Sequence, residues 1–282
     1  MSTASAKSRT WFITGCSTGI GREIASAVLA RGDRAAVTAR KTEAVADLLT
    51  EYPDQAIGLA LDVTVPEQVA SAVAEAEAAL GGIDVLVNNA GYGYMAALEE
   101  GEDQEVRQLF DTNFFGVVDT IKAVLPGMRA RGNGYIMNMS SMTGLVTNPP
   151  NIYYSASKHA LEALTEGLAK EVEPFGIRVT AIEPGAFRTD WATRSMKESA
   201  TPIADYAETV GARKELIKMA GDLLPGDPRR IADAVLMLAD LESPPLHLLL
   251  GEDVLNAFRD KLVAWQALLD EWEAVTRDVN FS

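Results

Sequence analysis

The stretch Thr14-Gly15-Cys16-Ser17-Thr18-Gly19-Ile20-Gly21 decides the fold of this chain. It follows a short apolar run, Thr10–Thr14, that we expect to form a strand, and it precedes a helical segment that begins near Arg22. Glycine lets the backbone turn sharply and approach a pyrophosphate closely, and the following helix offers free N–H groups at its N-terminus. A turn of this kind between a strand and a helix predicts a dinucleotide-binding fold.

Apolar, strand-like runs alternate with helical segments outward from this turn. The expected strands are Thr10–Thr14, Ala35–Thr38, Ala56–Leu61, Ile83–Val87, Tyr135–Met139, Arg178–Ile182 and Leu246–Leu250. The expected helices are Arg22–Arg31, Thr42–Tyr52 with Thr42 as its N-cap, Pro66–Leu80, Asp103–Ala130, Tyr154–Glu173 and Val254–Val275. Helical crossovers between strands imply parallel pairing, so the pattern predicts an α/β fold with a Rossmann-like, doubly wound parallel sheet. Ligands bind such sheets beyond the carboxyl ends of the strands.

We expect all 282 residues to form a single domain. Residues 1–9 are predicted to be a polar N-terminal tail, 10–185 the dinucleotide-binding and catalytic core, 186–226 a helical substrate lid, and 227–282 a C-terminal helical extension with the last strand. In the final helix Phe258, Leu262, Trp265, Leu269 and Trp272 recur every three or four residues. This spacing predicts a core face or a contact between subunits rather than a ligand site.

The composition excludes several classes of protein. The net charge of −15 makes binding to nucleic acid or to an anionic membrane surface unfavourable. The N-terminus lacks the apolar stretch of a signal peptide, and no apolar run is long enough to span a membrane, so a cytoplasmic location is expected. Cys16 is the only cysteine, and it suits packing inside the turn better than redox chemistry. His159 and His247 are the only histidines. With two histidines and one cysteine, neither a metal site nor Ser-His-Asp hydrolysis is predicted.

A tyrosine and a lysine at helical spacing form a candidate pair for proton transfer, although this spacing alone is a weak signal. Tyr154 and Lys158 stand four residues apart, on one face of a predicted helix. A nearby positive charge favours the phenolate and lowers the pKa of a tyrosine from its usual value near 10. The neighbouring Tyr153 has Ser157 at this spacing, so Tyr154 is the predicted acid/base and Tyr153 a packing residue or a cavity wall.

Several motifs occur in the order found in the short-chain dehydrogenase/reductase family, which residues 10–190 resemble. Thr14–Gly21 resembles its T-G-x-x-x-G-x-G turn, Asn88-Asn89-Ala90-Gly91 its N-N-A-G turn, Tyr154–Lys158 its Y-x-x-x-K and Pro184-Gly185 its P-G turn. The resemblance implies an oxidoreductase that transfers hydride between a nicotinamide cofactor and a carbonyl/alcohol pair. It assigns cofactor contacts to Gly15, Ser17, Thr18, Gly19, Ile20, Gly21, Asp62, Val63, Asn89, Ala90, Gly91, Tyr154, Lys158, Pro184, Gly185 and Thr189.

The same resemblance completes the predicted catalytic set. Ser141, three residues before Gly144 and thirteen before Tyr154, matches the family's catalytic serine and would hold the substrate oxygen. Its neighbour Ser140 is expected to be structural. Asn113 matches the family's helix asparagine: it would bond the backbone in an apolar helix, and the family adds a water bridge toward Lys158.

The end of the second strand bears on the choice of cofactor. An NAD-preferring site has an acidic residue there, whereas this chain has Ala39 followed by Arg40. Arg40 can pair with a 2′-phosphate, so NADP(H) is the preferred cofactor, with NAD(H) possible. The alternative is a solvated Arg-Lys pair before a helix. The residues expected around a hydrophobic substrate are Tyr92, Tyr94, Met95, Thr143, Phe187 and Trp191.

Two other functions compete with this prediction. A non-catalytic NADP(H)-binding redox sensor would use the same fold, but it has no need of Ser141, Tyr154 and Lys158 together. A nucleotide-sugar epimerase or dehydratase also uses Y-x-x-x-K, with a different first turn and a larger substrate domain. The expected partners are a small-molecule carbonyl or alcohol and further copies of the chain in a homodimer or homotetramer.

Overall fold

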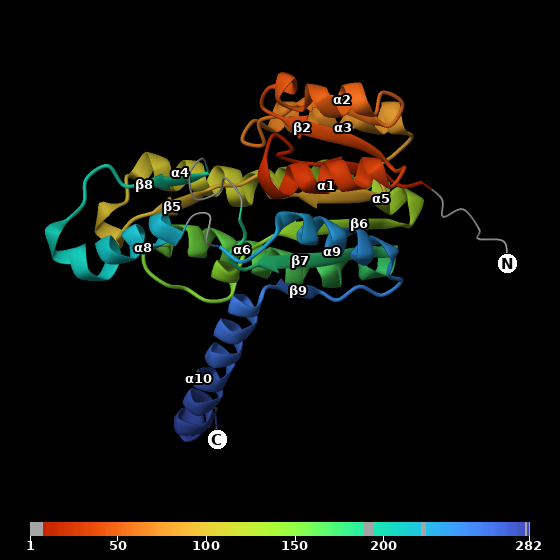
Figure 1. Ribbon diagram of the computed structural model, residues 1–282. Coiled ribbons are helices and arrows are strands. Elements are labelled where there is room, and N and C mark those ends of the chain that lie inside the picture. Colours follow the sequence, from red (N-terminus) through yellow and green to blue (C-terminus); the bar gives the residue numbers. More distant parts are fainter. Residues whose placement is uncertain (1–7, 189–194, 221–223, 280, 282) are drawn as a thin grey trace.

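A parallel sheet forms the centre of the protein (Figure 1). The computed structural model describes residues 8–188, 195–220, 224–279 and 281. Within these residues the seven strands of the main sheet lie in the order β3-β2-β1-β4-β6-β7-β9, and every neighbouring pair is parallel. The order reverses between β1 and β4, so the chain fills the sheet outward in both directions. The predicted single-domain, doubly wound Rossmann-like fold is confirmed.

The elements alternate along the chain as the sequence pattern predicts. The strands are β1 Thr10–Ile13, β2 Arg34–Ala39, β3 Ala56–Ala60, β4 Val85–Asn88, β5 Gly93–Met95, β6 Gly134–Met139, β7 Ile177–Pro184, β8 Met196–Glu198 and β9 His247–Leu250. The helices are α1 Gly19–Ala30, α2 Ala46–Glu51, α3 Pro66–Leu80, α4 Asp103–Phe110, α5 Gly116–Arg131, α6 Ile152–Val172, α8 Ala212–Ala220, α9 Pro228–Asp240 and α10 Glu252–Arg277.

Two apolar layers enclose the sheet. Helices α1 and α9 pack on one face, and α3, α5 and α6 pack on the other. Every residue of β1, β4 and β6 is buried, as a parallel sheet covered on both faces requires. With both faces covered, the carboxyl edge of the strands is left to form a site.

Two expected helices differ in detail. Thr42 was predicted to cap a helix, but it lies inside a short 3-10 helix, Thr42–Val45, that precedes α2 and has no side-chain cap. The predicted helix Asp103–Ala130 is divided into α4 and α5 by a π-helical turn, Asp111–Phe115. A π-turn inserts an extra residue into the helix and frequently occurs at functional sites.

A second, smaller sheet supports the segment that follows β7. Strand β5 pairs in parallel with β8, and the sequence pattern did not predict either strand. Beside them, the Lys214 Nζ lies 3.0 Å from the Glu100 Oε2, with both side chains buried. Burial raises the pKa of Glu100, but hydrogen bonds from the Ala97 and Ile203 N–H groups and from Lys214 outweigh it and lower the pKa to about 2. Glu100 therefore anchors the segment as a carboxylate.

Across the described residues, no helix combines the length and the apolar character needed to cross a membrane.

Candidate active site

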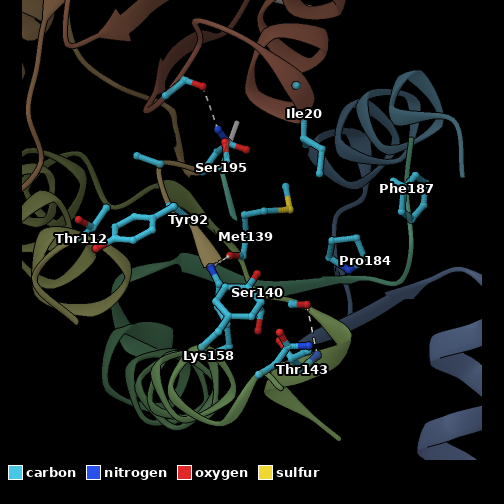
Figure 2. A pocket seen from close by; sticks show the side chains of 18 of the residues that line it. Ile20, Tyr92, Thr112, Met139, Ser140, Thr143, Lys158, Pro184, Phe187 and Ser195 are labelled. Carbon is cyan, nitrogen blue, oxygen red and sulfur yellow. Dashed lines mark hydrogen bonds between the residues drawn. The ribbon is translucent and has the colours of Figure 1, made fainter. Parts of the chain in front are cut away.

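A cavity of about 670 Å³ opens at the carboxyl ends of the strands. It runs from the turn after β1 to α8, and Figure 2 shows Ile20 and Phe187 on one side, with Tyr92 and Thr112 on the other. The predicted cofactor residues that line it are Gly15, Ser17, Thr18, Gly19, Ile20, Arg40, Asp62, Val63, Asn89, Ala90, Gly91, Tyr154, Lys158, Pro184 and Gly185. The lining also contains Ser141 and the predicted substrate residues Tyr92, Thr143 and Phe187.

Some predicted site residues lie elsewhere. Tyr94 and Met95 were expected to contact the substrate, but they belong to β5 and are fully buried outside the cavity lining. The Tyr94 hydroxyl bonds Glu102, and its ring packs against Tyr153. Tyr94 is a core residue because α4 and α6 pack against β5, where it clusters with Leu109 and Tyr154. Thr189 and Trp191 lie outside the described residues.

The glycine-rich turn has a backbone conformation that lets a ligand approach it closely. Gly15 and Gly19 have φ values of +73° and +61°, in the left-handed region that favours glycine. Gly21 does not line the cavity; a Cβ there would lie 2.2 Å from the Asn89 Nδ2 and 2.4 Å from the Gly15 carbonyl oxygen. Gly21 therefore serves the packing of α1 against the turn, while the N-terminus of α1 at Gly19 faces the cavity.

Hydrogen bonds join this turn to the turn after β4. The Asn89 and Ala90 N–H groups each donate to the Thr14 Oγ1 at 2.9 Å. The Asn89 Nδ2 donates to the carbonyl oxygens of Thr14 and Gly15, at 2.9 and 3.1 Å. The two turns therefore form one rigid floor at the point where the strand order reverses, which is where ligands bind such sheets.

Two charged residues line the end of the cavity near β2 and β3. Arg40 follows β2, is exposed, and has no hydrogen-bond or ion-pair partner among the described residues. Asp62 follows β3, and its Oδ1 accepts hydrogen bonds from the Thr64 N–H and hydroxyl at 3.0 and 2.7 Å. Arg40 and Asp62 therefore line the same cavity at the carboxyl ends of two neighbouring strands, β2 and β3.

The opposite end of the cavity contains the predicted proton-transfer residues. Tyr154 and Lys158, both 5% exposed, are presented by α6. The Lys158 Nζ donates to the Met139 carbonyl oxygen at 2.7 Å and lies 5.8 Å from the centroid of the Tyr154 ring. Ser141 begins a short 3-10 helix, where its Oγ accepts a hydrogen bond from the Thr143 N–H at 3.2 Å. Helix spacing and the end of β6 therefore bring the three predicted residues to one wall.

Burial controls the acidity of both groups on α6. It raises the pKa of Tyr154 to about 12, although the neighbouring Ser141 and Thr143 hydroxyls lower it. Burial also lowers the pKa of Lys158 to about 8, against the opposing effect of the Glu162 carboxylate. The sequence suggested a lowered tyrosine pKa; in the protein alone the loss of solvation is the larger effect.

Asn113 lies in the π-turn, and its side chain forms hydrogen bonds with the backbone of Tyr92 and the side chain of Ser157. Its Oδ1 accepts a hydrogen bond from the Tyr92 N–H at 3.0 Å, and its Nδ2 donates to the Tyr92 carbonyl oxygen and to the Ser157 Oγ, at 2.9 and 3.1 Å. It is buried outside the cavity lining. A Cβ on Gly91 would lie 3.1 Å from the Asn113 Oδ1 and 3.7 Å from the Lys158 Nζ, so the three residues are packed together.

The family model for short chain dehydrogenases matches residues 9–200. The chain belongs to the short-chain dehydrogenase family. As a member of this family, it is an oxidoreductase.

Three relatives illustrate the breadth of the likeness. A crystal structure of a short-chain dehydrogenase from Streptomyces avermitilis has 43% sequence identity and a TM-score of 0.92, and covers 98% of this chain and 100% of that one. A 3-ketodihydrosphingosine reductase from Bacteroides thetaiotaomicron is 36% identical over 85% of this chain and 86% of its own. The structure of ElxO with NADP bound has 27% identity and a TM-score of 0.74, over 88% of this chain and 99% of that one.

Further residues of the cavity in this short-chain dehydrogenase were not predicted. They come from four places in the sequence: Gln108 and Thr112 on α4 and the π-turn, Asn148, Pro149 and Asn151 before α6, Ser195 before β8 and Lys197 within it, and Arg213, Leu216, Ile217, Ala220 and Leu224 on and after α8. The Lys197 Nζ pairs with the Glu105 Oε2 at 2.6 Å and lies 5.0 Å from the Tyr92 ring centroid. The pairing of β5 with β8 and the Glu100–Lys214 ion pair help to bring these segments together, and both are long-range contacts that no local sequence pattern predicts.

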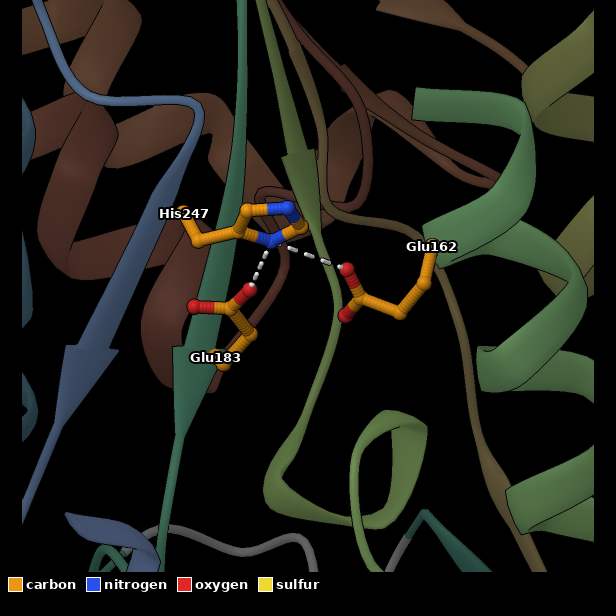
Figure 3. Close-up of side chains that lie close together, drawn as sticks. All are labelled: Glu162, Glu183 and His247. Carbon is orange, nitrogen blue, oxygen red and sulfur yellow. Dashed lines mark hydrogen bonds and ion pairs between the residues drawn. The ribbon is translucent and has the colours of Figure 1, made fainter. Parts of the chain in front are cut away.

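Two buried carboxyls, Glu162 and Glu183, and the partly buried His247 form a cluster of titratable groups next to Ser140 in this short-chain dehydrogenase (Figure 3). The His247 Nδ1 is 2.8 Å from the Glu183 Oε1 and 3.5 Å from the Glu162 Oε2. The Ser140 hydroxyl donates to Glu162, and Ser140 also lines the cavity beside Ser141. Glu162 follows Lys158 by one helical turn, so one face of α6 continues from the cavity into the cluster.

Protons are held tightly in this cluster. Burial raises the pKa of Glu162 to about 7 and that of Glu183 to about 8. Between the ordinary pKa of a glutamate and these raised values, the folded protein therefore keeps protons that the unfolded chain has released. The contribution of these two carboxyls to stability is therefore fully present below their ordinary pKa and is lost as the pH rises through the raised values.

We expect the free energy of unfolding to fall by a few kcal/mol between about pH 5 and pH 9 because of these two carboxyls. The substitution Glu183→Gln should flatten this dependence, since the amide stays neutral and can still bond His247. Chemical denaturation at a series of pH values measures the slope. The control is Glu166→Gln, which changes a half-exposed carboxyl 3.7 Å from the same imidazole and should leave the slope intact. Equal slopes in wild type and Glu183→Gln would contradict the assignment.

Proposed function

We propose that this protein is an NADP(H)-dependent oxidoreductase that interconverts a carbonyl compound and an alcohol, with Tyr154 as the general acid/base. One observation carries the proposal. Ser141, Tyr154 and Lys158 form one wall of a single cavity whose far end is the glycine-rich turn with Arg40 beside it. A dinucleotide spans such a distance, and its reactive ring would then meet the substrate beside the proton donor.

The residues present fit the cofactor. The left-handed glycines at Gly15 and Gly19 leave the turn without side chains that would hinder a pyrophosphate, and the N-terminus of α1 provides N–H groups for it. Asp62 and Val63 would border the adenine, and Pro184 and Gly185 the nicotinamide end. When bound, the nicotinamide supplies or accepts the hydride.

Side chains of this protein would bind the substrate oxygen and transfer the proton. Ser141 and Tyr154 would each donate a hydrogen bond to the carbonyl oxygen, and Tyr154 would pass its proton to that oxygen as it becomes an alcohol. In the reverse direction Tyr154 accepts the proton. Its pKa of about 12 suits the donor; the positive charge of Lys158, together with that of an oxidised nicotinamide, would lower it toward neutral pH for the acceptor. Lys158 would also hold the nicotinamide ribose.

Arg40 supports the preference for NADP(H). Its guanidinium lines the cavity and has no partner among the residues that the structure describes, and Ala39 beside it has no carboxylate that would repel a 2′-phosphate. The relative ElxO binds NADP.

The substitution Arg40→Ala should therefore weaken NADPH binding by about 10- to 100-fold, the effect of one charge-assisted hydrogen-bonding pair, and should leave NADH binding unchanged. Fluorescence titration of the purified variant with each nucleotide measures this. Arg129→Ala, which removes an exposed arginine of α5, is the matched control. A parallel loss for both nucleotides would refute the 2′-phosphate contact.

The cavity supports a hydrophobic substrate. Tyr92, Met142 and Phe187 line it together with Leu216 and Ile217 of α8. The ketone substrate named for the relative from Bacteroides thetaiotaomicron agrees with a carbonyl group in an apolar setting.

The first experiment is titration of the protein with NADPH and with NADH, followed by a panel of ketones and aldehydes with the tighter nucleotide. Tight NADPH binding, at least about tenfold tighter than NADH, and turnover of apolar ketones support the proposal. Binding of NADPH without turnover of any carbonyl would favour a non-catalytic sensor, and binding of neither nucleotide would overturn the whole proposal.

A further inference from the structure

Helix α10 extends away from the rest of the protein (Figure 1). Its 26 residues span about 39 Å, longer than most helices of globular proteins. Within it, Val254 is the one buried residue. The half-exposed or more exposed large apolar side chains beyond its second turn are Leu262, Val263, Trp265, Leu268, Leu269, Trp272 and Val275. Exposed apolar groups gathered on one element mark an interaction surface.

Six of the apolar residues form a continuous stripe. Spacings of three and four alternate through Leu255, Phe258, Leu262, Trp265, Leu269 and Trp272, which we call the α10 stripe. Alternation of this kind keeps the side chains on one face of a helix and is the pattern of a helix that packs along another helix. Trp265 and Trp272 are 54% and 51% exposed, so the described residues of the chain do not cover the stripe.

The base of the helix is held firmly to the protein. The Asp253 Oδ2 accepts a hydrogen bond from the Ala186 N–H at 2.7 Å, and the Lys261 Nζ bonds the Leu145 carbonyl oxygen. These contacts fix the direction of α10 at its first turns and leave the stripe presented to a partner. A preformed surface avoids the entropy cost of ordering a helix on binding.

We propose that the α10 stripe pairs with the same stripe of a second copy of this chain, with the two helices antiparallel. In the register that a two-fold axis near residue 267 creates, Leu262 faces Trp272 of the second copy, and Trp265 faces its Leu269. Each layer then matches one tryptophan with one leucine, and Leu268 meets its own copy beside the axis. A symmetric contact of this kind closes on itself and makes a dimer.

Flanking charges agree with the antiparallel direction. In the same register Arg259 stands beside Glu273 of the second copy. The two-fold symmetry creates a second such pair, between Glu273 and Arg259 of the second copy. Gln266 stands beside Gln266 between them. Parallel helices would instead place Lys261 beside Gln266 and leave Arg259 and Glu273 beside Val254 and Leu268. Opposite charges beside a helix–helix seam determine partner and orientation.

Size and charge favour a second copy over a lipid surface. The stripe exposes on the order of 600 Å² per chain, so pairing would hide about 1,200 Å², the lower bound for a stable, specific interface. Helix α10 carries six acidic residues and three basic ones. A net negative amphipathic helix is repelled by anionic lipid, whereas helices that lie on membranes are rich in Lys and Arg.

The test is the mass of the protein in solution, measured by light scattering after gel filtration over a range of concentrations. The double substitution Trp265→Glu/Leu269→Glu should raise the dissociation constant of the α10 contact at least about 100-fold and halve the mass. The matched control Ala267→Glu/Ala274→Glu adds two charges to the opposite face of the helix and should leave the mass unchanged. All these positions are exposed, and NADPH titration verifies that each variant is folded.

Charge reversal tests the direction. Arg259→Glu and Glu273→Arg should each weaken assembly several-fold, and the two together should restore it, because the pair is re-formed with its signs exchanged. Equal masses for wild type and the stripe variant would overturn the proposal, and failure of the double reversal to restore assembly would overturn the antiparallel pairing. A wild-type mass of one chain, with tryptophan fluorescence that shifts on phosphatidylcholine vesicles, would assign the stripe to lipid instead.

Discussion

Replacing Tyr154 by phenylalanine is expected to lower turnover by about a thousandfold, the usual contribution of a positioned acid/base. Nucleotide binding should change less than about twofold, because the ring that packs with Tyr94, Ala96 and Leu109 is retained. The hydroxyl is neutral at working pH, since burial raises the pKa of Tyr154 to about 12, so its loss removes no charge from the core. Steady-state kinetics with a ketone and NADPH, beside a fluorescence titration, separates the two effects.

The chain provides its own control for this variant. Tyr153 is adjacent, but its hydroxyl donates to the Leu98 carbonyl oxygen at 2.5 Å, away from the cavity. Tyr153→Phe should keep turnover within about threefold, at a stability cost on the order of 1 kcal/mol for the lost hydrogen bond. Near-normal turnover in Tyr154→Phe, or an equal loss in both variants, would remove Tyr154 from the reaction.

Substituting Lys158 by methionine is expected to reduce turnover at least about 100-fold and to weaken nucleotide binding, with little change in stability. Methionine fills the space of the lysine stem, and the substitution removes an ammonium group that is 5% exposed. Burial already lowers the pKa of Lys158 to about 8, which shows that the folded protein holds this charge unfavourably. The loss of its bond to the Met139 carbonyl oxygen offsets part of the gain.

Thermal unfolding and kinetics of the same preparation test this combination of effects. Lys170→Met is the control, since Lys170 lies on the same helix but is exposed and distant from the cavity. It should preserve activity. A large drop in the melting temperature of Lys158→Met would mean that Lys158 is mainly a structural residue, and the proposed role would then be rejected.

The parts of the site that could be predicted depend on neighbours in sequence. The glycine-rich turn, the i, i+4 pair Tyr154 and Lys158, and the alternation of strands with helices are local patterns, and a parallel sheet brings its strand ends to one edge whatever the details of packing. That is why Gly15, Ser141 and Tyr154 line one cavity although they are far apart in the chain.

The parts that were missed depend on long-range contacts. Tyr94 and Met95 resemble cavity residues in the sequence, but β5 pairs with β8, about a hundred residues later, and α4 and α6 pack against β5, so both side chains are buried. His247 lies on β9 and Glu183 on the neighbouring strand β7, so their contact depends on the pairing of these two strands. Glu162 approaches the same imidazole from α6. The π-turn around Asn113 has no signal of its own in a long helical pattern, because the extra residue is stabilised by bonds to Tyr92 and Ser157.

The buried pair of Glu100 and Lys214 has a consequence for how this protein can diversify. It anchors α8 to the rest of the protein, while Leu216 and Ile217, less than one helical turn further along, line the cavity. One residue of this short helix thus attaches it to the protein, and other residues of the same helix line the cavity. Mutations at the recognition positions can alter the range of accepted substrates without loosening the scaffold, so this segment is where an evolving or engineered lineage would acquire new specificities at the lowest risk to folding.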